Sequence, residues 1–135
     1  MCPLTGSYVL IITLDRDRTI EVGALGPREF AAGAYAYVGS AMGGLDARIA
    51  RHLRDDKRLH WHVDYLLQHA RVADVVRIET QRRVECETAN ALAERVPAVA
   101  GFGCSDCSCE GHLFGPIEGD ALTGAVAQAV GAVRD

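Results

Sequence analysis

One stretch decides the fold of this chain: Gly33-Ala-Tyr-Ala-Tyr-Val-Gly-Ser-Ala-Met-Gly-Gly-Leu-Asp-Ala-Arg-Ile-Ala-Arg-His52. Small and aromatic residues alternate as far as Val38, a pattern typical of a half-buried strand. The glycines that follow interrupt this alternation, and a helix is predicted to begin near Leu45. The stretch therefore predicts a strand, a glycine-rich turn and a helix in direct succession.

The predicted helix has an apolar face and a basic side. Residues three or four apart are neighbours on a helix surface, which places Leu45, Ile49 and Leu53 on one face. Basic side chains are expected beside or opposite this face, at Arg48, Arg51 and His52. Glycines allow a backbone to approach a ligand closely, and a helix start offers unpaired N–H groups. The corner is thus suited to an anion.

Composition indicates an ordinary globular chain. The 135 residues are 49% hydrophobic with a formal net charge of −4, and we expect a single domain over residues 1–135. Neither a bilayer-spanning apolar run nor a signal peptide is visible, so we expect a cytoplasmic protein without membrane contact. A local basic patch is still present, with a solvated helix face as the equal alternative; it comprises Arg48, Arg51, Arg54, Lys57 and Arg58.

The remaining segments complete an α/β (α+β) fold with a small mixed, mainly antiparallel central sheet flanked by helices. Strands are predicted at 6–14, 19–22, 33–39 and 72–78, with a short edge strand at 113–114. The first two strands are expected to form a hairpin, and 23–32 a loop. Helices are predicted within 57–67, 84–96 and 121–133; the apolar side of the second of these is expected to hold Cys86, Ala89, Leu92 and Ala93.

Several of these residues resemble the signature of the GIY-YIG nucleases. Gly6-Ser-Tyr8 and Tyr37-Val-Gly39 resemble its two halves, and Leu45-Asp-Ala-Arg48 with His52 matches the helix that carries a catalytic arginine. Glu85 matches the glutamate that holds the metal ion. The resemblance implies a GIY-YIG-like fold over almost the whole chain.

The later segments are similar to a mostly prokaryotic GIY-YIG-like family of unknown function, some archaeal members of which are fused to an endonuclease III-type DNA glycosylase. These segments are 60–67, 85–86 and 102–113. The chain departs from the standard nucleases in three ways. The interval between Tyr8 and Tyr37 is longer, the metal ligand can be Glu85 or Glu87, and the cysteine-rich segment is foreign to those enzymes.

The resemblance implies a phosphodiesterase with one Mg²⁺ or Mn²⁺ held by Glu85. Tyr8 or Tyr37 would orient or deprotonate the attacking water, Arg48 would bind the phosphate, and His52 would position water or a flanking phosphate. The alternatives are tyrosines that fill a core, an arginine in a surface salt bridge and a glutamate that interacts with a helix N-terminus. Nucleic acid is expected to contact Gly39, Ser40, Arg51, Lys57, His60 and His62.

A Cys/His-containing loop at 101–113 offers a different chemistry. Its side chains Cys104, Cys107, Cys109 and His112 suit Zn²⁺, although a structural loop with small buried thiols is favoured over a zinc site. The leading functional hypothesis is a metal-dependent endonuclease that acts on DNA in repair or processing, with a repair glycosylase as a partner. The alternatives are a non-catalytic nucleic-acid-binding module and a zinc-binding regulatory or interaction domain.

Overall fold

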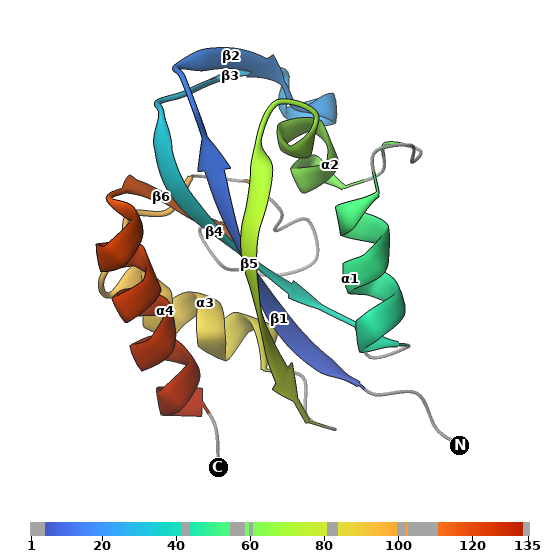
Figure 1. The fold of residues 1–135 in the computed structure, drawn as a ribbon, viewed down its shortest axis with the longest axis vertical. Coiled ribbons are helices and arrows are strands. Elements are labelled where there is room, and N and C mark those ends of the chain that lie inside the picture. Colours follow the sequence, from blue (N-terminus) through green and yellow to red (C-terminus); the bar gives the residue numbers. More distant parts are fainter. Residues whose placement is uncertain are drawn as a thin grey trace.

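The computed structural model describes residues 5–41, 44–54, 59, 61–80, 84–99, 102 and 111–133. Its centre is a four-stranded sheet in the order β5-β1-β4-β6 (Figure 1), in which every neighbouring pair is antiparallel. The strands are β1 (Gly6–Leu14), β4 (Gly33–Ser40), β5 (Arg71–Glu79) and β6 (Leu113–Ile117). The expected α+β architecture with a mainly antiparallel central sheet is confirmed.

Helices cover both faces of this sheet. They are α1 (Leu45–Leu53), α2 (His62–Leu67), α3 (Glu85–Ala93) and α4 (Gly119–Val133). Residues alternate between two cores along β1, because successive strand side chains point to opposite faces. Tyr8, Leu10 and Ile12 pack with α1 and α2, whereas Val9 and Ile11 pack with α3 and α4. This two-sided burial explains the nearly continuous apolar run of β1.

The sequence predicts a hairpin between the first two strands, and this prediction is wrong. β2 (Arg18–Glu21) pairs instead with β3 (Pro27–Phe30) in a separate two-stranded sheet, and the short 3₁₀ helix η1 (Gly23–Leu25) joins them. The expected loop at 23–32 thus contains a strand. This small sheet closes one end of the core through Ile20 and Phe30, both buried with the α1 side of the sheet.

The buried face of α1 differs from the predicted one by a single position. Leu45 and Ile49 are buried as expected, but Leu53 is 54% exposed. His52 takes the inward position at 2% exposure. Position 52 falls three residues after Ile49, so it shares the inward face as well as position 53 does. A correction of the same kind applies to α3, where Thr88, Ala89 and Leu92 are buried and Ala93 is exposed.

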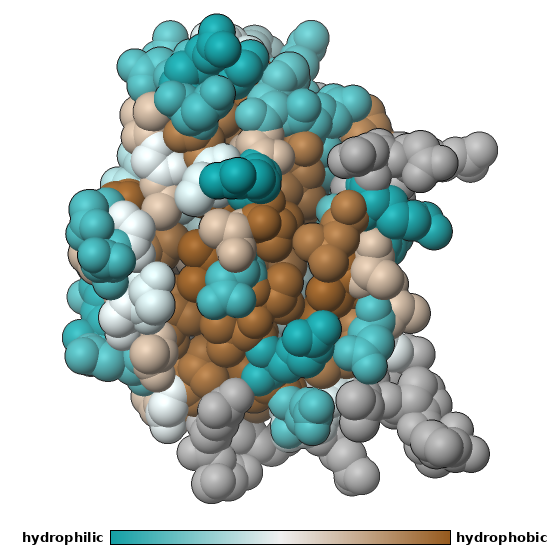
Figure 2. All heavy atoms as spheres, in the orientation of Figure 1, coloured by the Kyte–Doolittle hydropathy of each residue, from teal (hydrophilic) through white to brown (hydrophobic). Residues whose placement is uncertain are grey.

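The two edge strands differ in what protects them. β6 is a short edge strand, as predicted, and lies beside α4. β5 is longer, and Figure 2 shows apolar surface along it, where Val75 and Val76 are partly exposed. The exposed charges of Asp74 and Arg77 interrupt this surface, as is common for edge strands that avoid pairing with other chains.

Candidate functional site

The tyrosine of β1 and the histidine of α1 form a buried hydrogen-bonded pair. The Tyr8 hydroxyl lies 2.6 Å from His52 Nε2, and the two ring centroids are 5.4 Å apart. Tyr8 is 1% exposed and His52 is 2% exposed. Strand register explains the position of Tyr8, which lies opposite Gly39 of β4. A Cβ at residue 39 would overlap the Tyr8 ring, so glycine at this position makes room for it.

Arg48 lies between the end of β4 and an aromatic ring. Its Nη1 donates a hydrogen bond to the Ser40 carbonyl oxygen at 3.0 Å, and its Cζ lies 4.4 Å from the centroid of Trp61. His52 follows Arg48 by four positions, so both project from the same side of α1. Ser40 contributes its carbonyl group here. Its own hydroxyl is buried and has no hydrogen-bond partner in the described part of the chain.

Burial controls the acidity of the two signature tyrosines. It raises the pKa of Tyr8 to about 12, although the adjacent Arg48 guanidinium lowers that pKa in part, and Glu85 and Asp64 contribute to the rise. The pKa of Tyr37 is raised further, mainly by burial and then by Tyr8 and Glu85. Both phenols therefore stay protonated near neutral pH. Arg48 does not bring the pKa of Tyr8 below its ordinary value. Such a lowering would be required for Tyr8 to deprotonate the attacking water.

A buried carboxylate fixes the second arginine of α1. Arg51 donates two hydrogen bonds to Asp64, at 3.0 and 3.1 Å, and the Asp64 side chain is fully buried. The backbone N–H of Trp61 also donates to Asp64, at 2.9 Å, and His52 Nδ1 lies 4.0 Å from the same carboxylate. Arg51 was expected to contact nucleic acid. In the structure, Arg51 instead forms an ion pair that joins α1 to α2.

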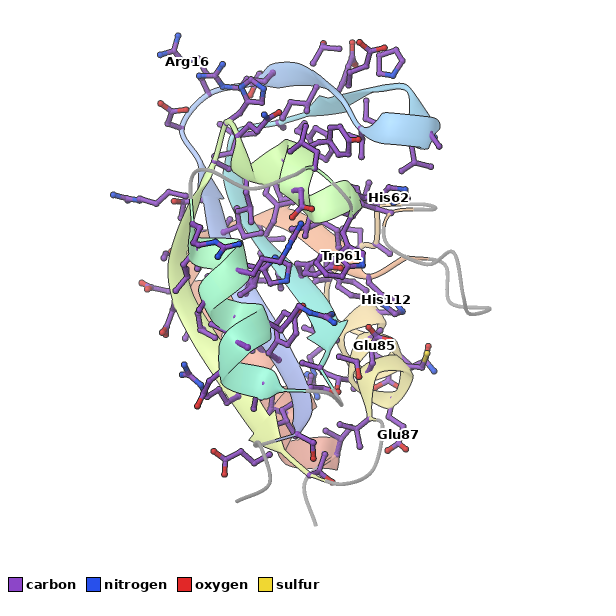
Figure 3. The ribbon with its side chains drawn as sticks, turned by 90° about the vertical axis from the view of Figure 1, so that its right-hand side faces the viewer. Arg16, Trp61, His62, Glu85, Glu87 and His112 are labelled. Carbon is purple, nitrogen blue, oxygen red and sulfur yellow. The ribbon has the colours of Figure 1, made fainter. Side chains whose placement is uncertain are left out.

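Glu85 lies in a cluster of three side chains with metal-binding donors. Glu85 Oε2 is 3.6 Å from His112 Nδ1, and the donor atoms of Glu85, Cys86 and His112 all lie within 4.8 Å of one another. Figure 3 shows Glu85 and His112 directed toward each other near the start of α3. Glu87 points away from them and is exposed. Glu85 is therefore the glutamate that faces the tyrosines, and a possible metal site exists around it.

His62 and His112 have other neighbours than those expected from the sequence. His62 lies edge-on to Phe102 with centroids 5.5 Å apart, and burial lowers its pKa. His112 was expected in a zinc loop with the cysteines but meets Glu85. The remaining predictions fall outside the described residues and concern Lys57, His60, Cys104, Cys107 and Cys109.

Three residues of the site were not among the predicted site residues. Trp61 contacts Arg48 and also Arg51, whose Cζ lies 4.3 Å from its ring centroid. Asp64 holds Arg51, and Cys86 joins the metal cluster. The one available signal was the dense run of polar and aromatic residues at 60–65. Cys86 lies in a segment that resembles a family of unknown function, but its helical position indicated only an apolar face and not a metal ligand.

The raised pKa of Tyr8 predicts a loss of stability in alkali. An unfolded tyrosine has a pKa near 10, so between pH about 10 and about 12 the native state keeps a proton that the unfolded state has released. Stability then falls by about 1.4 kcal/mol per pH unit for this group. Urea unfolding across this range should show a shallower decline for Tyr8→Phe than for wild type. Equal slopes would contradict the assignment.

A hollow lies beside the C-terminal end of α1, next to the buried pair. It is lined by His52, Leu53, Arg54, Leu67, Ala70, Arg71 and Val72. Two exposed arginines, Arg54 and Arg71, thus line the hollow together with the buried His52. An anionic group that enters this hollow would find positive charge on its rim.

Comparisons with known proteins place the chain in a family without assigning an activity. Among the helices of the described residues, even the 15-residue α4 falls short of the length and apolar character that a membrane span requires. No curated protein and no solved structure matches the chain. One family model matches residues 7–134. The chain therefore belongs to the family described as a domain of unknown function, DUF123.

Proposed function

We propose that this chain is a metal-dependent phosphodiesterase of the GIY-YIG type that cleaves nucleic acid, with DNA undergoing repair or processing as its substrate. One observation carries the proposal. The buried hydrogen bond between Tyr8 and His52 has the guanidinium of Arg48 and the carboxylate of Glu85 close enough to alter the pKa of Tyr8. These four groups come from β1, α1 and α3, in the order that the nuclease signature has.

The sheet supports the comparison with that nuclease family. β1 and β4 are adjacent and antiparallel, which places Tyr8 and Tyr37 on the same sheet face, in the core that also holds α1. The ring of Tyr37 also meets His52, with centroids 6.1 Å apart. Tyr35 shares this face, but its hydroxyl donates to the Ala31 carbonyl oxygen at 2.6 Å. Tyr37 is therefore the second tyrosine of the proposed site.

The roles of Tyr8 and His52 follow from their donor and acceptor capacity. A guanidinium can only donate, and a hydrogen bond from Arg48 is one cause that lowers the pKa of Tyr8. The phenol proton is then directed to His52 Nε2, 2.6 Å away. A protonated Tyr8 orients groups rather than acting as a base. In this proposal His52 receives the proton of the attacking water, either directly or through Tyr8.

Arg48 is assigned the phosphate. Its planar donors suit a phosphoryl group, and the hollow beside His52 has further guanidinium groups at its rim. A divalent ion, Mg²⁺ or Mn²⁺ on the family pattern, would neutralise phosphate charge when bound at Glu85. Glu85 would hold that ion, and its place near Tyr8 would keep the ion close to the proton-transferring pair.

A non-catalytic nucleic-acid-binding module is the second candidate, and one observation favours it. Tyr8 and His52 are almost fully buried, so a phosphate cannot touch both groups unless side chains around them move. The basic rim of the hollow would still bind a nucleic acid strand. A repair glycosylase remains a proposed partner in either case. A zinc-binding regulatory role of the cysteine loop likewise remains a proposal.

Cleavage of a panel of labelled substrates tests the proposal. Wild-type protein with Mg²⁺ or Mn²⁺ is expected to cut at least one of single-stranded, nicked, flapped, abasic or branched DNA, or the matching RNA. Glu85→Gln should lower the rate at least about a hundredfold, as loss of an electrostatic contact to the transition state does. Glu87→Gln is the matched control on the same helix turn and should cut normally. Binding without cleavage by wild type would instead support the module.

A further inference from the structure

We propose that Glu85, Cys86 and His112 form a single binding site for a thiophilic divalent cation, zinc or a chemically similar ion, rather than a site for Mg²⁺. The inference replaces the Mg²⁺ or Mn²⁺ of the family pattern with another class of ion at Glu85, and it rests on the proposed function only for the role of the ion. It also places the zinc chemistry that the sequence indicated in a different set of residues.

The backbone holds the three donors in place. The His112 N–H donates to the Phe102 carbonyl oxygen at 2.7 Å, and its own carbonyl accepts from the Val38 N–H at 2.9 Å. The imidazole is therefore carried by a segment that is hydrogen-bonded to β4, and His112 is 2% exposed. Glu85 and Cys86 lie in the first turn of α3, which Thr88 ties to the Val84 carbonyl oxygen through both its N–H and its hydroxyl.

The spacing of the donors suits a tetrahedral ion. Zinc bonds of about 2.0–2.3 Å put two ligand atoms about 3.5 Å apart in a tetrahedron. The distance of 3.6 Å between Glu85 Oε2 and His112 Nδ1 already meets this value. Cys86 is the third donor, with its Sγ within 4.8 Å of the other two. A shift of about 1 Å by its partly exposed side chain would complete the arrangement.

The chemistry of the donors selects the ion. Mg²⁺ prefers oxygen ligands and retains its waters, whereas a set of one carboxylate, one thiolate and one imidazole suits Zn²⁺. Binding would form a metal–sulfur bond and release the thiol proton to solvent. Three protein ligands leave a fourth position open, as in catalytic rather than structural zinc sites. The carboxylate of Glu85 raises the pKa of both Tyr8 and Tyr37, so an ion held by Glu85 would act on these two phenols as well.

Metal titration of the purified, metal-free protein tests this inference without any substrate. Co²⁺ serves as the probe, because a thiolate ligand gives it a sulfur-to-metal charge-transfer absorption. One Co²⁺ per chain should bind with this absorption, and Zn²⁺ should displace it while excess Mg²⁺ should not. Cys86→Ser should abolish the absorption and weaken Co²⁺ affinity more than about 100-fold, since even outer-shell changes cost 10- to 100-fold. Glu85→Gln and His112→Ala should weaken affinity similarly.

Two controls separate this site from other sources of binding. Glu87→Gln removes an exposed carboxylate from the same helix turn and should leave Co²⁺ binding unchanged. A triple Cys→Ser variant of the cysteine loop, at positions 104, 107 and 109, should also keep the absorption of the proposed site. Circular dichroism of each variant checks the fold. Cys86→Ser changes one atom of a partly exposed residue, so it keeps the test valid if His112→Ala fails to fold.

The inference is overturned if the absorption survives Cys86→Ser, or if Co²⁺ binds no more tightly than Mg²⁺. Its failure is distinguishable from that of the proposed function. Cleavage with Mg²⁺ that is lost in Glu85→Gln and unchanged in Cys86→Ser would preserve the nuclease and remove the thiophilic site. Thiolate-dependent metal binding in a protein that cuts no substrate would preserve the site and remove the nuclease.

Discussion

Replacing Arg48 with alanine is expected to lower the cleavage rate at least about a thousandfold, the effect of removing an arginine that stabilises a phosphoryl transition state. Arg48 is the one basic side chain in the described part of the chain that both donates to the end of β4 and acts on the pKa of Tyr8. Its loss removes positive charge at the point where the phosphate is proposed to lie. The loss should appear in kcat rather than in KM.

Two comparison variants give this result its meaning. Arg16→Ala removes the same charge from an exposed position far from Trp61 and Glu85 (Figure 3), and should cleave like wild type. Arg48→Lys keeps the charge without the planar donors and should recover only part of the rate. Equal losses in Arg48→Ala and Arg16→Ala would mean that Arg48 contributes general attraction to nucleic acid. Thermal unfolding of each variant checks that the lost bond to Ser40 has not disrupted the fold.

The central sheet could be predicted because its strands carry patterns that local physics makes strong. A nearly unbroken apolar run can only be a strand buried on both faces or a buried helix, and the polar turn at 15–18 limits its length. The alternation before Val38 likewise predicts a strand, but β4 is buried on both faces rather than half-buried, with Tyr37 in one core and Val38 in the other. The strand predicted at 19–22 corresponds to β2, but β3 was not predicted, because it has only four residues and the pairing of β2 with β3 depends on η1 between them.

Within the candidate site, only residues whose positions are set by a single strand or helix could be predicted. Tyr8, Tyr37 and Arg48 could be placed from strand alternation and helical spacing combined with a family signature. The burial of the His52 side chain could not be predicted, because the pattern of a nine-residue helix does not decide whether position 52 or position 53 faces the core. The meeting of Cys86 with His112 depends on how α3 lies against the edge of β4, which no local pattern encodes.

The pairing of Arg51 with Asp64 belongs to the same class of tertiary contact, and it connects the site to the stability of the fold. Asp64 lies in the first turn of α2 and accepts a hydrogen bond from the backbone N–H of Trp61, which stabilises the start of that helix. Trp61 in turn packs against Arg48. The carboxylate therefore supports the arginine of the proposed site without touching a substrate. Its removal should affect folding first and cleavage second.

Asp64→Ala is expected to lower the free energy of unfolding by about 3 kcal/mol, the low end of the range for breaking a buried ion pair. The carboxylate is fully buried, but the Arg51 side chain is 21% exposed and regains some hydration. Asp46→Ala is the matched control, because it breaks the pair with Arg77 at 3.3 Å, whose side chains are 67% and 45% exposed. That surface pair should contribute less than about 1 kcal/mol. Urea unfolding of both variants measures the difference, and similar losses would contradict a structural role for Asp64.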